Sequence, residues 1–213
     1  MISSGSITPN TYQLWGQVMG NMHRLTKLYA PSPGIVPRPQ WDHETVHTLV
    51  VDGAVHDLSA QYLELQGAIA WLRSLDQSKE SFGLIHCDLH YGNFFVHNNR
   101  MTVFDFDDSC YHWFAYDVAV PLFLLQFSFA RENMPFDDSE FLTNFFRGYQ
   151  QENSLEQTWH DSITPFLRYR AILLHYWCRL QIARNALSGN TIDWCQECAN
   201  WTETVIIGSP FFR

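Results

Sequence analysis

The sequence predicts a mainly helical α+β fold in which helices pack around one short β-hairpin. Apolar residues recur at three- and four-residue spacing in most segments, the spacing that gives a helix one buried face. Two short apolar runs flank Asn98-Asn99-Arg100, and asparagine tolerates the positive φ of a tight turn. With 213 residues and 46% hydrophobic content the chain can bury a full core, so we expect residues 1–213 to form a single domain.

Two helices and a strand are predicted before the hairpin. Thr8 and Pro9 are typical of a helix start, and the helix should continue to about residue 29. Its buried face is predicted to comprise Leu14, Trp15, Val18, Met19, Met22 and Leu25. The prolines of residues 30–52 indicate a loop. Asp57 should cap a second helix ending near residue 77, and residues 82–85 should form a strand.

The hairpin strands are predicted at residues 94–97 and 101–104. Antiparallel pairing about Asn99 then sets Phe94 against Phe104, and Asn93 against Asp105. Residues 109–114 are expected to be a connection. The remaining helices are predicted at residues 115–130, 136–151, 162–187 and 191–207. The helix at 115–130 is apolar on nearly all sides, which favours a central, buried position.

The hairpin carries a group of polar residues that points to chemistry. Carboxylates near a core are costly unless a cation or hydrogen bonds compensate their desolvation, so the acids around residues 86–108 suggest a metal site. Opposed strand residues lie roughly 5 Å apart, close enough for Asn93 and Asp105 to share a hard divalent cation. The array His86-x-Asp88-x4-Asn93, then a hairpin, then Asp105, is the arrangement of a protein-kinase catalytic site.

These residues resemble a known family. His86-Cys87-Asp88-Leu89-His90-Tyr91-Gly92-Asn93 is similar to the H-G-D-L-H-x-G-N signature of aminoglycoside phosphotransferases and related choline, homoserine and other small-molecule kinases. Val103-Phe104-Asp105-Phe106-Asp107-Asp108 resembles their I-D-[WF]-[DE] metal segment. Cys87 stands where glycine is usual.

The resemblance implies a role for each matching residue. Asp88 would be the catalytic base, His86 would brace the catalytic loop, and Asn93 and Asp105 would bind Mg²⁺ against the phosphates of ATP. Asp108 would support a second metal ion or the residues around it. Asp117 matches the family's buried structural aspartate.

The implied fold is a protein-kinase-like C-terminal lobe, with its catalytic loop and metal segment at residues 84–108 and the N-terminal β lobe absent. Before residue 57 there is no run of alternating β-branched residues and no Val-Ala-x-Lys, and the only lysines are Lys27 and Lys79. The implied function is ATP- and Mg²⁺-dependent transfer of the γ-phosphoryl group to a hydroxyl of a small molecule. The alternative is a non-catalytic, truncated kinase-like remnant or binding module, and we expect the isolated chain to be inactive.

Charge and cysteine content restrict partners and location. The formal net charge of −9 disfavours nucleic acid as a partner and is compatible with a cationic substrate. Five cysteines are an odd number without a secretory segment, so a reducing, cytoplasmic location is expected. We expect no membrane segment, and we expect self-association through the surface that the absent lobe would cover.

Several polar groups also have a simpler interpretation. A metallohydrolase cluster of His86, Asp88 and His90 would leave Asn93 and Asp105 unexplained. Cys195-x-x-Cys198 is half of a zinc motif, but packing is the favoured interpretation without a second pair nearby. A solvated surface is favoured for Asp107, and loop packing for His90 and Tyr91. An acidic group between two predicted helices could bind an amine or simply face solvent: Glu132, Asp137, Asp138 and Glu140.

Overall fold

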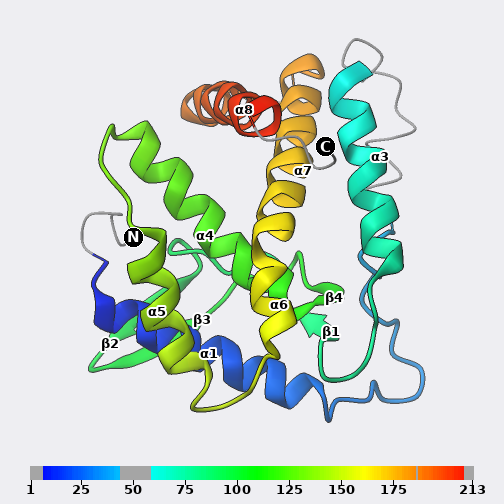
Figure 1. The fold of residues 1–213 in the computed structure, drawn as a ribbon, viewed down its shortest axis with the longest axis vertical. Coiled ribbons are helices and arrows are strands. Elements are labelled where there is room, and N and C mark those ends of the chain that lie inside the picture. The colour runs from blue at the N-terminus through cyan, green and yellow to red at the C-terminus, as the bar shows by residue number, and fades with distance from the viewer. Residues whose placement is uncertain (1–6, 44–58, 186, 209–213) are drawn as a thin grey trace. The chain divides into compact units, whose positions relative to one another are not determined.

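The computed structural model describes residues 7–43, 59–185 and 187–208. The chain divides into two compact units, the first comprising residues 1–41 and 77–163 and the second residues 42–76 and 164–213. Both units are mainly helical, and the strands of the described residues belong to the first (Figure 1). The predicted mainly helical α+β fold is therefore confirmed. That the two units form a single domain stays a prediction.

Helices and two small antiparallel sheets make up the first unit. One sheet pairs β1 with β4 and the other pairs β2 with β3. The elements are α1 (Pro9–Thr26), β1 (Phe82–Ile85), β2 (Phe94–His97), β3 (Arg100–Val103), β4 (Cys110–Trp113), α4 (Phe114–Arg131), α5 (Asp138–Tyr149) and α6 (Gln157–Asp161).

Helix α1 begins as predicted. The Thr8 side chain accepts a hydrogen bond from the Thr11 backbone amide, and Pro9 occupies the first turn, where its missing N–H costs nothing. Its buried face is rotated from the predicted one, since Leu25 is 52% exposed. The residues that are buried are Tyr12, Trp15, Gly16, Met19, Gly20 and His23.

Two glycines explain this rotation, because they let α1 cross α5 at backbone contact. A Cβ on Gly16 would lie 1.8 Å from the Phe145 carbonyl oxygen, and a Cβ on Gly148 would lie 1.8 Å from that of Gln13. Helix α1 therefore turns Gly16, and not its leucines, toward α5, and α5 turns Gly148 toward α1. The crossing also brings His23 of α1 beside Tyr149 of α5.

The hairpin is one residue tighter than predicted. His97 pairs with Arg100 and Phe94 with Val103, so the predicted pairing of Phe94 with Phe104 is wrong. The physical reason lies in the turn, because Asn98 and Asn99 both adopt positive φ, 48° and 57°. Two successive residues of this kind form a two-residue type I′ turn, and no third loop residue is needed.

The prediction that residues 109–114 form a connection is wrong. They contain β4, which pairs with β1 in the register Phe82 to Trp113 and Ile85 to Cys110. Tyr111 also bonds to residues 39–41, accepting from the Trp41 amide at 2.9 Å and donating to the Pro39 carbonyl at 2.8 Å. These partners are distant in sequence, so no local pattern indicated the strand.

The helices after β4 follow the sequence closely. Helix α4 is buried on nearly all sides, as predicted for residues 115–130. Asp137 caps α5, its side chain accepting from the amides of Ser139 and Glu140. The short helix α6 was not predicted.

The second unit contains α3 (Ser59–Ser74), α7 (Ile163–Ala183) and α8 (Asn190–Gly208). Cys195 and Cys198 are fully buried in α8, which agrees with the packing interpretation. A hydrogen bond with Cys198 and burial both raise the pKa of the Cys178 thiol, so that sulfur stays protonated. The proposed cap Asp57 lies outside the described residues.

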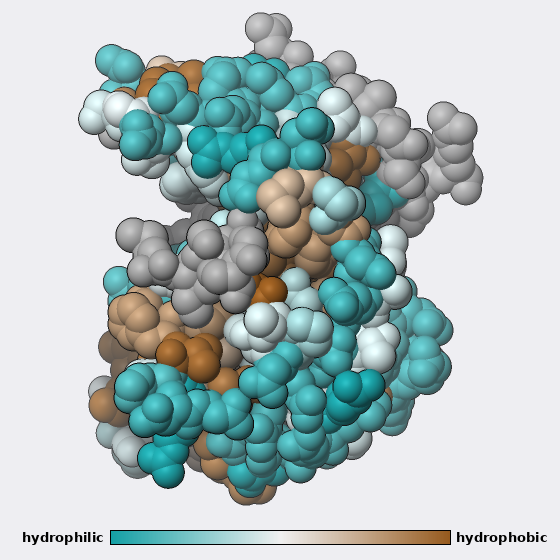
Figure 2. Space-filling view, turned by 90° about the vertical axis from the view of Figure 1, so that its left-hand side faces the viewer, coloured by the Kyte–Doolittle hydropathy of each residue, from teal (hydrophilic) through white to brown (hydrophobic). Residues whose placement is uncertain are grey.

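The surface is mostly hydrophilic on the face shown in Figure 2, with separate hydrophobic patches. Exposed apolar side chains include Leu28, Val36 and Leu63, each more than two-thirds exposed. None of the helices within the described ranges is both long and apolar enough to span a membrane.

Candidate active site

The loop between β1 and β2 carries the predicted catalytic residues, and His86 connects this loop to the end of β3. His86 is buried, and its Nδ1 accepts from the Asp88 backbone amide at 3.4 Å. Its Nε2 therefore carries the hydrogen and donates to the Phe104 carbonyl at 3.1 Å. Nδ1 thus holds the turn of the loop at Asp88, and Nε2 links the loop to Phe104 in the metal segment.

Asp88 and Asn93 are brought together. The Asn93 Nδ2 donates to the Asp88 backbone carbonyl at 2.9 Å and to Asp88 Oδ2 at 3.3 Å. Asn93 is only 6% exposed, and its own backbone amide donates to the His90 carbonyl at 2.9 Å. With Nδ2 committed to Asp88, Oδ1 is the side-chain atom of Asn93 that remains suited to a cation.

Asp105 does not stand opposite Asn93, and that predicted pairing is wrong by one position. Phe104 occupies the position, donating its amide to the Asn93 carbonyl at 3.1 Å. Asp105 follows with a φ of 64°, the left-handed conformation that turns the chain sharply after the strand. Asn93 of the catalytic loop and Asp105 of the metal segment are therefore one position away from a cross-strand pair at the end of the hairpin.

Asp107 and Asp108 lie beyond Asp105 in an exposed turn, where the Ser109 amide donates to the Phe106 carbonyl at 3.1 Å. Arg38 donates to the backbone carbonyl of Asp107 at 3.0 Å, and the Asp107 side chain is exposed, as expected for a solvated residue. Asp108 is also exposed, three positions after Asp105.

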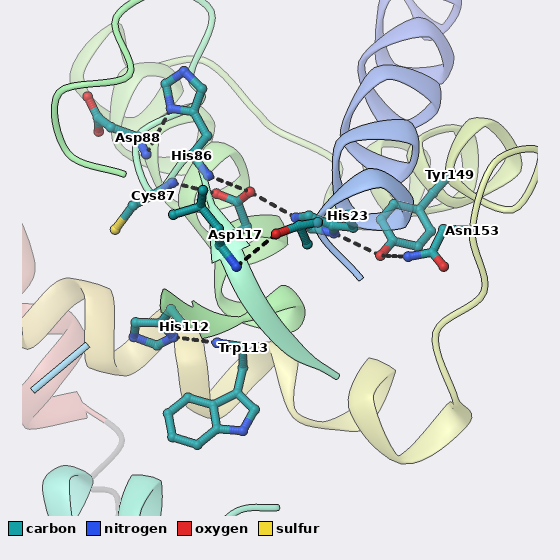
Figure 3. Close-up of polar contacts among 11 residues, drawn as sticks. His23, His86, Cys87, Asp88, His112, Trp113, Asp117, Tyr149 and Asn153 are labelled. Carbon is teal, nitrogen blue, oxygen red and sulfur yellow. Dashed lines mark hydrogen bonds and ion pairs between the residues drawn. The ribbon is translucent and has the colours of Figure 1, made fainter. Parts of the chain in front are cut away.

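Asp117 of α4 binds the backbone of the catalytic loop. Asp117 is fully buried, as predicted, and its carboxylate accepts from the amide of His86 at 3.3 Å and from that of Cys87 at 2.9 Å (Figure 3). Two successive amides thus reach one carboxylate, and the chain then turns at Cys87, which has a φ of 70°. Such a pair of N–H groups forms a concave anion site in the backbone. The left-handed φ of Cys87 explains why glycine is usual at this position in the family that the sequence resembles.

His23 of α1 is fully buried, and the sequence did not indicate its partners. His23 Nε2 lies 2.9 Å from Asp117 Oδ2, and Nδ1 lies 2.8 Å from the Tyr149 hydroxyl. Asn153 in turn donates to that hydroxyl at 3.0 Å. Burial raises the pKa of Tyr149 far above its usual value, so the phenol keeps its hydrogen. No sequence signal links Tyr149 to His23, because 126 residues separate them.

His90 also contributes more than loop packing. Its Nε2 lies 3.5 Å from Asp88 Oδ2, while its Nδ1 accepts from the Gly92 amide at 2.9 Å. Because Nδ1 accepts the hydrogen bond from the Gly92 amide, the hydrogen of the neutral His90 ring lies on Nε2, the nitrogen that faces Asp88. Tyr91, in contrast, packs away from the loop, with its hydroxyl 2.6 Å from the Ser128 hydroxyl.

The donor set suits a hard cation and does not suit a metallohydrolase. Carboxylate and amide oxygens are the ligands that Mg²⁺ prefers, and Asn93, Asp105 and Asp108 supply them. Within residues 7–43, 59–185 and 187–208, no three or more His, Cys, Asp or Glu side chains are grouped to hold a metal ion. His86 does not fit the hydrolase interpretation of His86, Asp88 and His90, since both of its ring nitrogens are already bonded.

Comparison with known proteins identifies a matching family and a similar curated protein. The model of one family, described as the phosphotransferase enzyme family (APH), matches residues 3–160. Amicoumacin kinase of Bacillus subtilis (strain 168) is 36% identical over 169 residues, covering 77% of this chain and 49% of that protein. The chain thus spans about half the length of this curated relative.

Solved structures show the same fold. One, described as amicoumacin kinase hAmiN in complex with AMP-PNP, Ca²⁺ and Ami, is 28% identical with a TM-score of 0.78, covering 98% of this chain and 62% of that one. A microcompartment-associated aminopropanol kinase is 20% identical with a TM-score of 0.65, covering 95% of this chain and 64% of that one, and shows likeness of fold alone. The predicted kinase-like fold is confirmed.

Proposed function

The chain belongs to the phosphotransferase enzyme family, and from this premise we propose that it carries the catalytic loop and metal segment of an ATP-dependent small-molecule kinase. The observation that carries the proposal is the pairing of Asp88 with Asn93 on a loop held by the buried Asp117. A base and a metal-binding amide fixed to each other are what phosphoryl transfer requires, because positioning and electrostatics supply most of its catalysis.

The proposed reaction assigns one proton transfer to the protein. The acceptor hydroxyl loses its proton to the Asp88 carboxylate as its oxygen bonds to the γ-phosphorus of ATP. The bond from that phosphorus to the β-bridging oxygen breaks, and ADP leaves with the bonding electrons. Asn93 keeps the Asp88 side chain in place through its Nδ2, and the Nε2–H of His90 lies beside the same carboxylate oxygen.

Asn93 and Asp105 are the proposed ligands of Mg²⁺, with Asp108 supporting a second ion. When bound, Mg²⁺ neutralises charge that develops on the transferred phosphoryl group. The AMP-PNP and Ca²⁺ named for the solved amicoumacin kinase support use of a nucleotide with a divalent cation here.

The proposed substrate is a small hydroxyl compound with a positive charge, and amicoumacin, the compound in the relatives' names, is the first candidate to assay. The net charge of −9 supports a cationic substrate. The acidic residues at 132–140 contribute less than the sequence suggested, because Asp137 is used as a helix cap and Asp138 accepts from Gln126 at 2.8 Å. A cytoplasmic location, where ATP is available, is part of the proposal.

Binding of Mg²⁺ with AMP-PNP to the purified chain, measured by calorimetry, tests the proposal. We expect weak binding that is lost in Asp105→Asn and kept in Asp107→Asn, a matched exchange in the same segment. Equal binding by parent and Asp105→Asn would contradict the site assignment.

A second candidate, a non-catalytic binding module, is favoured by the position of the lysines. Lys27 caps the end of α1, and Lys79 lies in a turn, so neither is on a strand where a kinase lysine would reach the nucleotide phosphates. We therefore expect no turnover of ATP by residues 1–213 alone. Rapid phosphorylation of amicoumacin by this chain would exclude the second candidate.

Self-association is also proposed, because several large apolar side chains remain exposed near the end of α1. Those more than half exposed are Leu25, Leu28, Tyr29, Ile35 and Val36. Light scattering that gives the monomer mass of 24.9 kDa at all concentrations would exclude it.

A further inference from the structure

Five side chains form a continuous hydrogen-bonded path from the protein surface to the catalytic loop. The path begins at Lys27, which donates to Asn153. It continues from Asn153 through Tyr149 and His23 to Asp117, which holds the amides of His86 and Cys87 (Figure 3). We propose that Lys27, Asn153 and Tyr149 are positioning residues that fix which ring nitrogen of His23 carries its hydrogen, and thereby hold Asp117 and the catalytic loop in place.

The direction of each hydrogen bond follows from the first one. A lysine ammonium can only donate, so the Asn153 atom at 2.9 Å from Lys27 Nζ is the amide oxygen, Oδ1. This orients the Asn153 Nδ2 toward the Tyr149 hydroxyl, 3.0 Å away, where it donates. The oxygen and nitrogen of the Asn153 amide are therefore assigned by the donor-only character of the lysine, and not by their similar shapes.

Tyr149 passes the direction on to His23. Its hydroxyl accepts from Asn153, so its single hydrogen is directed to His23 Nδ1 at 2.8 Å. A His23 nitrogen that accepts has no hydrogen, and the neutral ring then carries its hydrogen on Nε2. That nitrogen lies 2.9 Å from Asp117 Oδ2, where an N–H donor is required.

The opposite tautomer would disrupt the loop. An unprotonated Nε2 would place its lone pair against the buried Asp117 carboxylate, and the repulsion would displace a group that also binds two loop amides. Phe114 limits any rotation of the His23 ring, since the two rings stack at 4.4 Å between centroids. The Lys27 ammonium lies over the same Phe114 ring, 5.9 Å from its centroid. The inner part of the path is closed to water, because Tyr149, His23 and Asp117 are fully buried, whereas Lys27 at its outer end is 14% exposed.

Nitrogen NMR of the His23 ring tests this directly. We expect the parent to show an Nε2–H ring with an unprotonated Nδ1. In Asn153→Asp the new carboxylate can only accept, so Tyr149 turns its hydrogen to residue 153 and Nδ1 loses its donor. We expect the hydrogen of the His23 ring to move from Nε2 to Nδ1 in this variant, and amide exchange at Cys87 to accelerate at least tenfold.

Asn144→Asp, the same exchange at a position on α5 outside the path, is the control and should change neither signal. Tyr149→Phe should accelerate exchange at Cys87 in the same way as Asn153→Asp. A parent His23 with hydrogen on both nitrogens or on Nδ1 alone, or an unchanged ring in Asn153→Asp, would overturn the proposal. Only the consequence for phosphoryl transfer rests on the proposed function, and because these signals require no nucleotide, the two can fail separately.

Discussion

Replacing Asp117 with asparagine tests whether one buried carboxylate holds the catalytic loop. Its two oxygens accept from three N–H groups: His23 Nε2 and the His86 amide at Oδ2, and the Cys87 amide at Oδ1. Asparagine keeps the shape but replaces one oxygen with NH₂, which faces at least one of those donors in either orientation. At least two buried polar groups are then unsatisfied, at about 1–3 kcal/mol each.

This gives a loss of about 2–6 kcal/mol in the free energy of unfolding, in line with the roughly 3–5 kcal/mol for removing one partner of a buried pair. Urea unfolding followed by circular dichroism measures the loss, and hydrogen exchange at the Cys87 amide locates it. Asp107→Asn is the matched control, since its side chain is exposed, and should stay within about 0.5 kcal/mol of the parent. A loss in Asp117→Asn below about 1 kcal/mol, with unchanged exchange at Cys87, would refute the reasoning.

Three further predictions concern the packing and titration of particular residues. Gly148→Ala gains about 1 kcal/mol of helix propensity but places a Cβ 1.8 Å from the Gln13 carbonyl oxygen, so thermal unfolding should show a net loss of stability. Thr143→Ala, on the exposed side of α5, is the control and should show no such loss. At Cys87, where φ is 70°, valine should be about 1–2 kcal/mol less stable than glycine in urea; equal stabilities would argue against the left-handed backbone. Burial lowers the pKa of His175, so the unfolded chain takes up this proton first and stability should fall as the pH drops below about 6.5, by at most about 1.4 kcal/mol per pH unit. In His175→Gln, the free energy of unfolding measured in urea should depend less on pH below about 6.5. The same pH dependence in the parent and the variant would contradict the lowered pKa of His175.

Local patterns predicted the helices well because capping and periodicity are local. Thr8 and Pro9 begin α1, Asp137 caps α5, and the apolar segment at residues 115–130 is the buried helix α4. The fold class also followed from the motif at residues 86–93, because His86, Asp88 and Asn93 lie on one loop and need no long-range pairing to meet.

Contacts between distant segments could not be predicted from such patterns. Strand β4 exists because residues 82–85 and 39–41 pair with it, and the face of α1 is set by the glycine at 148 on another helix. The hairpin loop was predicted one residue too long. Asn98 and Asn99 both adopt positive φ, so two residues complete the turn, whereas the prediction centred the turn on Asn99 alone. Tyr149 and Asn153 carried no sequence signal as partners of the loop.

Paramagnetic broadening by Mn²⁺ tests most directly whether the end of the hairpin is a metal site. Mn²⁺ takes the same oxygen ligands as Mg²⁺ and broadens the NMR signals of nearby groups. With AMP-PNP present, we predict that Mn²⁺ broadens the Asn93 side-chain amide and the Asp105 backbone amide first, and that Asp105→Asn abolishes this while Asp107→Asn does not. Broadening that is centred elsewhere, or that persists unchanged in Asp105→Asn, would contradict the assignment of this loop and hairpin as a phosphotransferase active site.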